Sequence, residues 1–211
     1  MLLGRDPAVL FALGLIILIC FPVHEFSHAL AAYRLGDGTA KLMGRLTLNP
    51  IAHFDPIGAL LLLVAGFGWA KPTPVNPYNL RGGRYGEGIV AAAGPISNLV
   101  LASAAALPLR YIVMTEMSVP RIFEETLYWF VVFNVILFVF NLIPIPPLDG
   151  SKVLFSLLNP RTVWQVRPTL ERYGFILLIL AAFVPIGRGG TLVGIVFDSV
   201  AQPLVNFLTG L

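Results

Sequence analysis

The chain has 211 residues, of which 57% are hydrophobic and 12% charged, roughly half the charged share of an ordinary globular domain. With a mean hydropathy of +0.83, this composition excludes an ordinary soluble domain and indicates an integral membrane protein. The net charge of +3 does not indicate nucleic-acid binding, because the basic residues are scattered between apolar runs without forming a stripe. The single cysteine, Cys20, excludes an intrachain disulfide.

The first apolar run is expected to form one helix over residues 6 to about 33. Asp6-Pro7 is suited to begin it, and the glycines at 36 and 38 are suited to end it. Pro22 is expected to kink this helix or to loosen its hydrogen-bond ladder. We expect the run to be retained rather than cleaved as a signal peptide, because it lacks a small-residue cleavage site after a basic region.

The second half of this helix carries His24-Glu25-Phe26-Ser27-His28. Two histidines four residues apart share one helical face, where both can bind a Zn²⁺ ion, and the glutamate can act as general base on a zinc-bound water. An Asp, Lys or Arg at the centre of a membrane helix costs about 2.5–3.5 kcal/mol, so ionisable residues kept there usually serve a function. That cost disfavours the alternative of a polar cluster that only stabilises helix packing.

Two short segments follow before the next long apolar run. Residues 39–48 alternate in polarity and are a candidate strand. The apolar run 56–69 is shorter than the ~20 residues that a membrane-crossing helix needs. Because basic residues flank it on both sides, we expect it to re-enter the membrane and return on the same side, with the proline-rich segment 71–77 as the extended return leg.

The remaining apolar runs predict further membrane-spanning helices. The acidic balance of the loop 114–125 places it outside, and the basic residues on the other loops indicate the cytoplasm. This orientation puts the N-terminus outside and the motif end of the first helix toward the cytoplasm. The fold class expected is an all-α polytopic membrane protein. It has about five transmembrane helices and a short membrane-associated β or re-entrant segment between the first and second full spans. The later spans are expected over residues 88–113, 126–142, 173–186 and 192–208.

A catalytic zinc takes three protein ligands and leaves one position open, so His24 and His28 need a partner. Asp149 is our choice, because it follows a proline-broken helix end on the same expected side of the membrane. His53 is the alternative third ligand, although a supporting or gating role suits it better. Cys20 lies on the face of His24 and is interpreted as a small buried hydrophobe rather than a thiolate ligand.

Three motifs in order, His24 to His28, Gly94-Pro95-Ile96-Ser97-Asn98, and Asn141 through Leu148-Asp149-Gly150, resemble the core of the site-2 protease family of intramembrane zinc metalloproteases. The likeness covers about residues 15–155, within one expected membrane protease domain of residues 1–211 whose C-terminal helices occupy about 170–211. The chain resembles small prokaryotic members without PDZ or CBS domains. The resemblance implies the following roles: His24, His28 and Asp149 bind one Zn²⁺ per chain, Glu25 activates the water, Asn141 and Pro147 lie beside the scissile peptide, and Asn98 supports the core.

By this resemblance the protein is a zinc-dependent endopeptidase of a prokaryotic cell membrane. Its partners would be the lipid bilayer and membrane-protein substrates, whose transmembrane segments it would cleave, often to release a regulator; no nucleic acid is expected, and no oligomeric state is predicted. The segments 39–48 and 71–77 could capture an extended substrate by β-addition. The alternative is a metal-binding membrane protein without proteolysis, either a transporter or a pseudoprotease. A transporter should show paired broken helices in two halves, and the retained Glu25 argues against a pseudoprotease.

Overall fold

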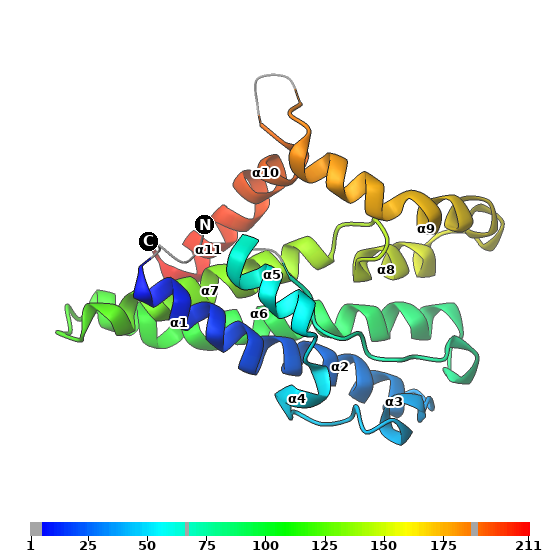
Figure 1. The fold of residues 1–211 in the computed structure, drawn as a ribbon, viewed down its shortest axis with the longest axis horizontal. Coiled ribbons are helices and arrows are strands. Elements are labelled where there is room, and N and C mark those ends of the chain that lie inside the picture. The colour runs from blue at the N-terminus through cyan, green and yellow to red at the C-terminus, as the bar shows by residue number, and fades with distance from the viewer. Residues whose placement is uncertain (1–5, 66–67, 187–189) are drawn as a thin grey trace.

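The structure is a computed structural model that describes residues 6–65, 68–186 and 190–211. Helices account for all the regular structure of these ranges, apart from one isolated bridge between Pro185 and Thr191. The expectation of an all-α fold is therefore confirmed for the described residues. Figure 1 shows the long helices running side by side, with the C-terminal helices α9 and α10 forming an inverted V above them.

The first helix is continuous over 28 residues from Pro7 to Arg34, and it consists of α1 (Pro7–Leu15), the π-helical turn η2 (Ile16–Cys20) and α2 (Phe21–Arg34). Asp6 caps its start by accepting a hydrogen bond from Ala8 N at 2.9 Å. The ladder is loosened as expected near Pro22, because Phe21 N–H, just before the proline, donates to Ile16 O five residues back. The motif therefore lies on a regular helical segment directly after this turn.

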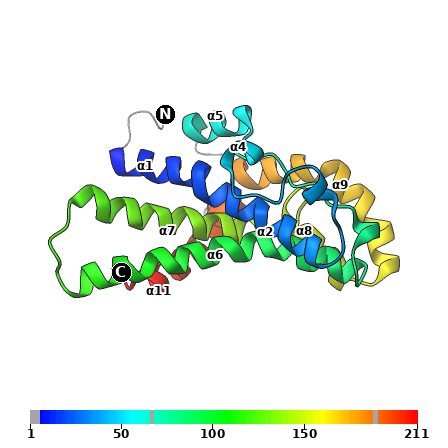
Figure 2. The ribbon, with the colours of Figure 1, turned by 90° about the horizontal axis from the view of Figure 1, so that it is seen from below.

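The long helix α6 (Arg84–Met114) is the centre of the bundle and packs against α2, α7 (Arg121–Asn141), α8 (Asp149–Leu157) and α11 (Gln202–Thr209). Figure 2 shows α6 and α7 running side by side beneath the first helix. One apolar cluster joins α1 and η2 to α7 through Leu13, Ile16 and Phe130. A second joins α6 and α7 to the C-terminal helices through Ala102, Val135 and Val205.

Within the described ranges, four helices are long and apolar enough to cross a membrane: Pro7–Arg34, Arg84–Met114, Arg121–Asn141 and Leu192–Thr209. The last comprises α10 (Leu192–Val196), the π-helical turn η4 (Phe197–Ala201) and α11. These four correspond to four of the five expected spans. The fifth, at 173–186, is the second half of α9 (Pro160–Phe183), whose first half carries Arg161, Arg167 and Glu171. The count of five spans is therefore not confirmed.

The prediction of a strand over residues 39–48 is wrong. Its start forms the one-turn helix α3 (Thr39–Leu42), and turns and bends follow. Directly before this turn, Asp37 Oδ1 accepts a hydrogen bond from Thr39 N at 3.1 Å. Alternation alone did not distinguish the two structures, and no neighbouring strand among the described residues supplies a ladder. A second one-turn helix, α4 (Pro50–His53), is capped by Asn49.

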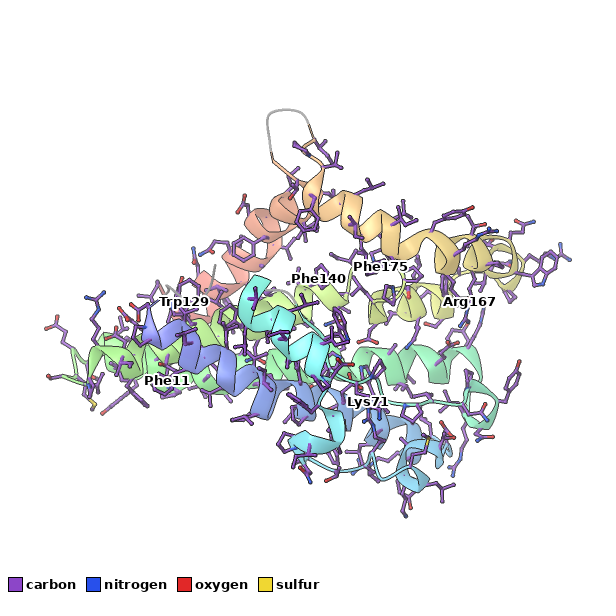
Figure 3. The ribbon with its side chains drawn as sticks, in the orientation of Figure 1. Phe11, Lys71, Trp129, Phe140, Arg167 and Phe175 are labelled. Carbon is purple, nitrogen blue, oxygen red and sulfur yellow. The ribbon has the colours of Figure 1, made fainter. Side chains whose placement is uncertain are left out.

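The described residues that follow α5 (Pro56–Ala65), from 68 onward, lie back along this helix. Lys71, labelled in Figure 3, donates its backbone N–H to His53 O at 2.9 Å, so the chain returns to the residue where it left α4. A Cβ atom on Gly58 would lie 2.1 Å from Trp69 O, so only a glycine permits this close approach of the two legs. The return leg continues, without helix or strand, to the 3₁₀ turn η3 (Pro77–Asn79). This out-and-back path has the shape of the predicted re-entrant element, and its insertion into the bilayer stays a prediction.

The break predicted after the third span is present, since α7 ends at Asn141 and α8 begins at Asp149. The intervening loop contains a cis peptide bond between Pro146 and Pro147. The helix α9 crosses this loop at Gly174, where a Cβ atom would lie 2.2 Å from Pro146 O. An ion pair of 3.1 Å between Arg167, labelled in Figure 3, and Glu87 ties α9 to α6.

Candidate functional site

His24 and His28 on α2 meet Asp149, the first residue of α8. The two Nε2 atoms lie 3.0 Å apart, and they lie 3.2 and 3.1 Å from Asp149 Oδ2. All three residues are buried. Among the described residues, these three form the one group of His, Cys, Asp and Glu side chains that could hold a metal ion. The structure thus brings together the three residues predicted as ligands.

The second ring nitrogen of each histidine is already engaged. His24 Nδ1 lies 2.6 Å from Asn98 Oδ1, and His28 Nδ1 lies 2.7 Å from Val90 O. Because both partners are acceptors, each Nδ1 carries the proton and each Nε2 presents a lone pair toward the other two ligand atoms. Atoms bound tetrahedrally at 2.0–2.1 Å from one Zn²⁺ lie about 3.3 Å apart, close to the separations found here. The residues present therefore fit a zinc ion.

Gly94 on α6 gives this site its space. A Cβ atom at this position would lie 2.3 Å from His28 Nε2 and 2.6 Å from His24 Nε2. Both distances are shorter than any ordinary carbon–nitrogen contact, so a larger residue would displace the two imidazoles. In the sequence Gly94 stands out only as part of the family motif, because its contact with the ligands depends on how α6 packs on α2.

Glu25, the residue directly after His24, is held by the return leg. Thr73 N–H donates to Glu25 Oε2 at 2.7 Å, and Thr73 Oγ1 donates to the Glu25 carbonyl oxygen at 3.0 Å. Thr73 carries no signal of this role in the sequence, because 48 residues separate it from Glu25 and its neighbours in the sequence carry no motif. The backbone N–H of Thr73 thus fixes one oxygen of the Glu25 carboxylate, and its hydroxyl ties the main chain of α2 to the return leg.

Arg45 fixes the return leg in turn. Its guanidinium donates to Lys71 O and Pro72 O on the leg and to Ala52 O on α4. Burial lowers the pKa of Arg45 and the nearby charge of Glu25 opposes that shift, and arginine stays protonated in either case. This buried cation therefore ties the residues directly before Thr73 to α4.

Asn98, predicted to support the core, is fully buried and bonded to His24. Its Nδ2 donates to the Oδ1 of Asn134 on α7 at 3.1 Å, and Asn134 is also fully buried. Asn134 was not predicted as a site residue. The one feature in the sequence that could have pointed to it is the presence of an amide in the middle of an apolar span. Cys20 is buried and lies 3.1 Å from Asn134 Nδ2, so the structure places it in this network and outside the metal group.

The metal group consists of His24, His28 and Asp149 alone among the described residues, and the other predicted site residues have surroundings of their own. Asn141, at the end of α7, donates to Leu137 O at 3.0 Å. Pro147 is exposed on the loop before α8. His53 is buried, with Nε2 2.8 Å from Thr47 O, and it is not a member of the metal group. His53 thus joins α4 to the preceding segment through Thr47 and to the return leg through Lys71.

Comparison with known proteins agrees with this geometry. The chain is 42% identical over 175 residues to a Bacillus subtilis protein named "Putative zinc metalloprotease YwhC", with 81% of this chain and 80% of that protein covered. Residues 108–184 match the model of Peptidase family M50. The chain belongs to Peptidase family M50, the site-2 protease family. The resemblance and the zinc cofactor expected from the motifs are confirmed: this M50 member is a zinc metalloendopeptidase of the membrane.

A second relative supports the same assignment. A Mycolicibacterium smegmatis protein named "Putative zinc metalloprotease Rip2" is 30% identical over 190 residues, with 84% of this chain and 68% of that protein covered. No solved structure matches the chain.

Proposed function

We propose that the chain hydrolyses peptide bonds within the transmembrane segments of membrane-protein substrates. The observation that carries this proposal is the position of the buried group His24, His28 and Asp149. Its two histidines lie on a helix of 28 residues that is apolar enough to cross a membrane. A zinc site within such a helix would face bonds that are themselves inside the bilayer. Family membership argues against the alternative of a transporter, and the retained Glu25 argues against a pseudoprotease.

In this proposal His24, His28 and Asp149 hold the zinc ion. The zinc supplies Lewis acidity, which polarises the scissile carbonyl and makes water a stronger acid. Asn98 and the Val90 carbonyl keep the two imidazoles in the tautomer that ligation requires. Gly94 leaves the room that the ligand atoms need.

Glu25 is assigned as the general base. Its carboxylate accepts a proton from the attacking water and returns it to the leaving amine, so the peptide is hydrolysed without net proton change. The Thr73 N–H holds Oε2, and the second carboxylate oxygen is the one we assign to the water. Holding the base in one orientation reduces the entropy lost on reaching the transition state.

The return leg 71–77 is assigned to substrate binding. Its three prolines favour an extended backbone, and Arg45 and Asp37 hold it through Lys71, Pro72 and Asn76. An extended, fixed segment beside Glu25 could pair with an unwound substrate by β-addition. Residues 39–48 have no part in this proposal, since they form no strand. Asn141 and Pro147 are assigned positions beside the scissile peptide, and His53 a supporting role under the leg.

The membrane arrangement is part of the same proposal. Residues 1–211 form one protease domain of a prokaryotic cell membrane, with a core at about 15–155 and C-terminal helices at about 170–211. The N-terminus lies outside and the active site toward the cytoplasm, as the loop charges favour. The second half of α9 crosses as a fifth span, and α5 re-enters from the cytoplasmic side.

The position of the cut tests the proposal. Purified protein is incubated with a reconstituted single-span model substrate, and the products are mapped by mass spectrometry. We expect cleavage inside the hydrophobic segment, abolished by a zinc chelator and restored by added zinc. Cleavage confined to the soluble flanks of the substrate would contradict intramembrane proteolysis while leaving metallopeptidase activity intact.

A further inference from the structure

Asn134 is a polar residue at the middle of a membrane-spanning helix, with no exposed surface. A buried amide is costly unless its donors and acceptor are paired. Here both ends are paired: Oδ1 accepts from Asn98 Nδ2 at 3.1 Å, and Nδ2 donates to Phe130 O at 2.9 Å. The amide thus links its own helix, α7, to the residue on α6 that contacts His24.

The series of hydrogen bonds from Phe130 through Asn134 and Asn98 to His24 has its directions fixed at the Phe130 end. Phe130 O can only accept, so the NH₂ group of Asn134 must face it and Oδ1 must face Asn98. Asn98 then presents its NH₂ group to Asn134 and its oxygen to His24. A backbone carbonyl therefore determines, through two side-chain amides, which atom meets the imidazole.

The last hydrogen bond of this series determines the tautomer of His24. Asn98 Oδ1 lies 2.6 Å from His24 Nδ1 and can only accept, so Nδ1 carries the proton. The lone pair is left on Nε2, the atom that lies 3.0 Å from His28 Nε2 and 3.2 Å from Asp149 Oδ2. If Asn98 rotated its amide by half a turn, its NH₂ group would face Nδ1 and favour the other tautomer.

We propose that Asn134 is a positioning residue of the metal centre, which acts through Asn98 to hold the His24 ring in its ligating tautomer and orientation. This inference rests on the proposed role of His24 as a zinc ligand. A residue that only joined α7 to α6 would affect the stability of the fold. A positioning residue also affects the metal affinity and ligand field of the folded protein.

The test uses the full-length protein in detergent. Zinc affinity is measured by competition with a chelator, and the visible absorption spectrum is recorded after substitution of Co²⁺ for zinc. Loss of a residue directly bonded to a metal-ligating histidine typically weakens metal binding 10–100-fold. We expect that range for Asn98→Ala, and about tenfold with a shifted cobalt spectrum for Asn134→Leu. Asn206→Leu removes an exposed amide from the last span and is expected to match the wild type in both measurements.

The double variant Asn98→Ala/Asn134→Leu separates positioning from general support. Because Asn134 acts through Asn98, we expect the double variant to bind zinc no more weakly than Asn98→Ala alone. A further tenfold loss in the double variant would overturn the proposal, as would wild-type affinity and spectrum in Asn134→Leu. If the leucine variant does not fold, Asn134→Ala removes the same amide and gives the same comparison.

His24→Ala distinguishes this proposal from the one on which it rests. We expect this variant to lose zinc binding more severely than any change at Asn98 or Asn134. Wild-type affinity in His24→Ala would contradict the ligand assignment itself. Weak binding in His24→Ala combined with no effect in Asn134→Leu would overturn only the role of Asn134.

Discussion

Thr73 holds Glu25 from two sides, with its N–H on the carboxylate at 2.7 Å and its hydroxyl on the main-chain carbonyl at 3.0 Å. The residue assigned as general base is therefore oriented by a segment that lies far away in the sequence. Because the same segment is the proposed binding edge for substrate, the two functions share one piece of backbone. This coupling makes the return leg the most informative place to perturb the site without touching a ligand.

Thr73→Pro removes the N–H that holds Glu25 Oε2. We expect cleavage of a model substrate to slow by about tenfold or more, because general-base catalysis contributes about 10²–10⁴ and depends on orientation. Zinc content should be unchanged, since none of the three metal-group residues is altered. Thr73→Val keeps the N–H and loses only the hydroxyl, and it should retain most of the activity. Equal loss in both variants would contradict the role of the backbone donor.

Gly94→Ala places a Cβ atom where the structure has 2.3 Å to His28 Nε2. We expect the folded protein to lose most of its bound zinc and its activity, because the two imidazoles must move apart. Metal analysis of the purified protein measures the effect. Gly14→Ala is the matched control, since a Cβ there meets nothing within 4 Å and alanine favours a helix. Full zinc occupancy in Gly94→Ala would show that the site is looser than this packing implies.

Asp37 predicts a pH dependence of stability at the far end of the return leg. Burial raises the pKa of this carboxyl, but hydrogen bonds from Thr39, Asn76 and Asn79 outweigh burial and hold the pKa below its usual 3.8. A lowered pKa in the folded state stabilises the protein above the pKa of the unfolded state, and this stabilisation is lost as the pH falls through the folded pKa.

Thermal unfolding of the wild type and Asp37→Asn at several pH values checks this account. Asparagine cannot accept the same set of bonds, so we expect the variant to be less stable near pH 7, with the difference narrowing below about pH 4. A difference that stays constant from pH 7 to pH 3 would mean that the charge of Asp37 does not stabilise the fold.

Sequence patterns predicted the parts of this protein that depend on local composition. Long apolar runs mark the four candidate spans, and the spacing of His24 and His28 places them on one helical face. Asp149 could be chosen as their partner because a proline-broken helix end in a membrane protein tends to mark a site and an unpaired carboxylate is costly there.

The residues that orient the site depend on packing between segments distant in the sequence, and no local pattern encodes that packing. Thr73 and Asn134 resemble ordinary loop and span residues until the chain returns past Glu25 and α7 packs on α6. Residues 39–48 show the opposite failure: their alternation fits a strand, but no strand among the described residues pairs with them, and their start forms a helical turn. Sequence therefore indicated the ligands more readily than the residues that orient them.

Comparison of the wild type with Glu25→Gln in one assay tests whether Glu25 is the general base of peptide hydrolysis. Cleavage of a reconstituted transmembrane substrate and zinc content are measured on the same purified samples. We predict that Glu25→Gln keeps its zinc, because the three residues of the metal group are intact, and loses at least a hundredfold in cleavage rate, because the amide cannot accept the proton from water. Metal-dependent cleavage at the wild-type rate in Glu25→Gln would contradict the account.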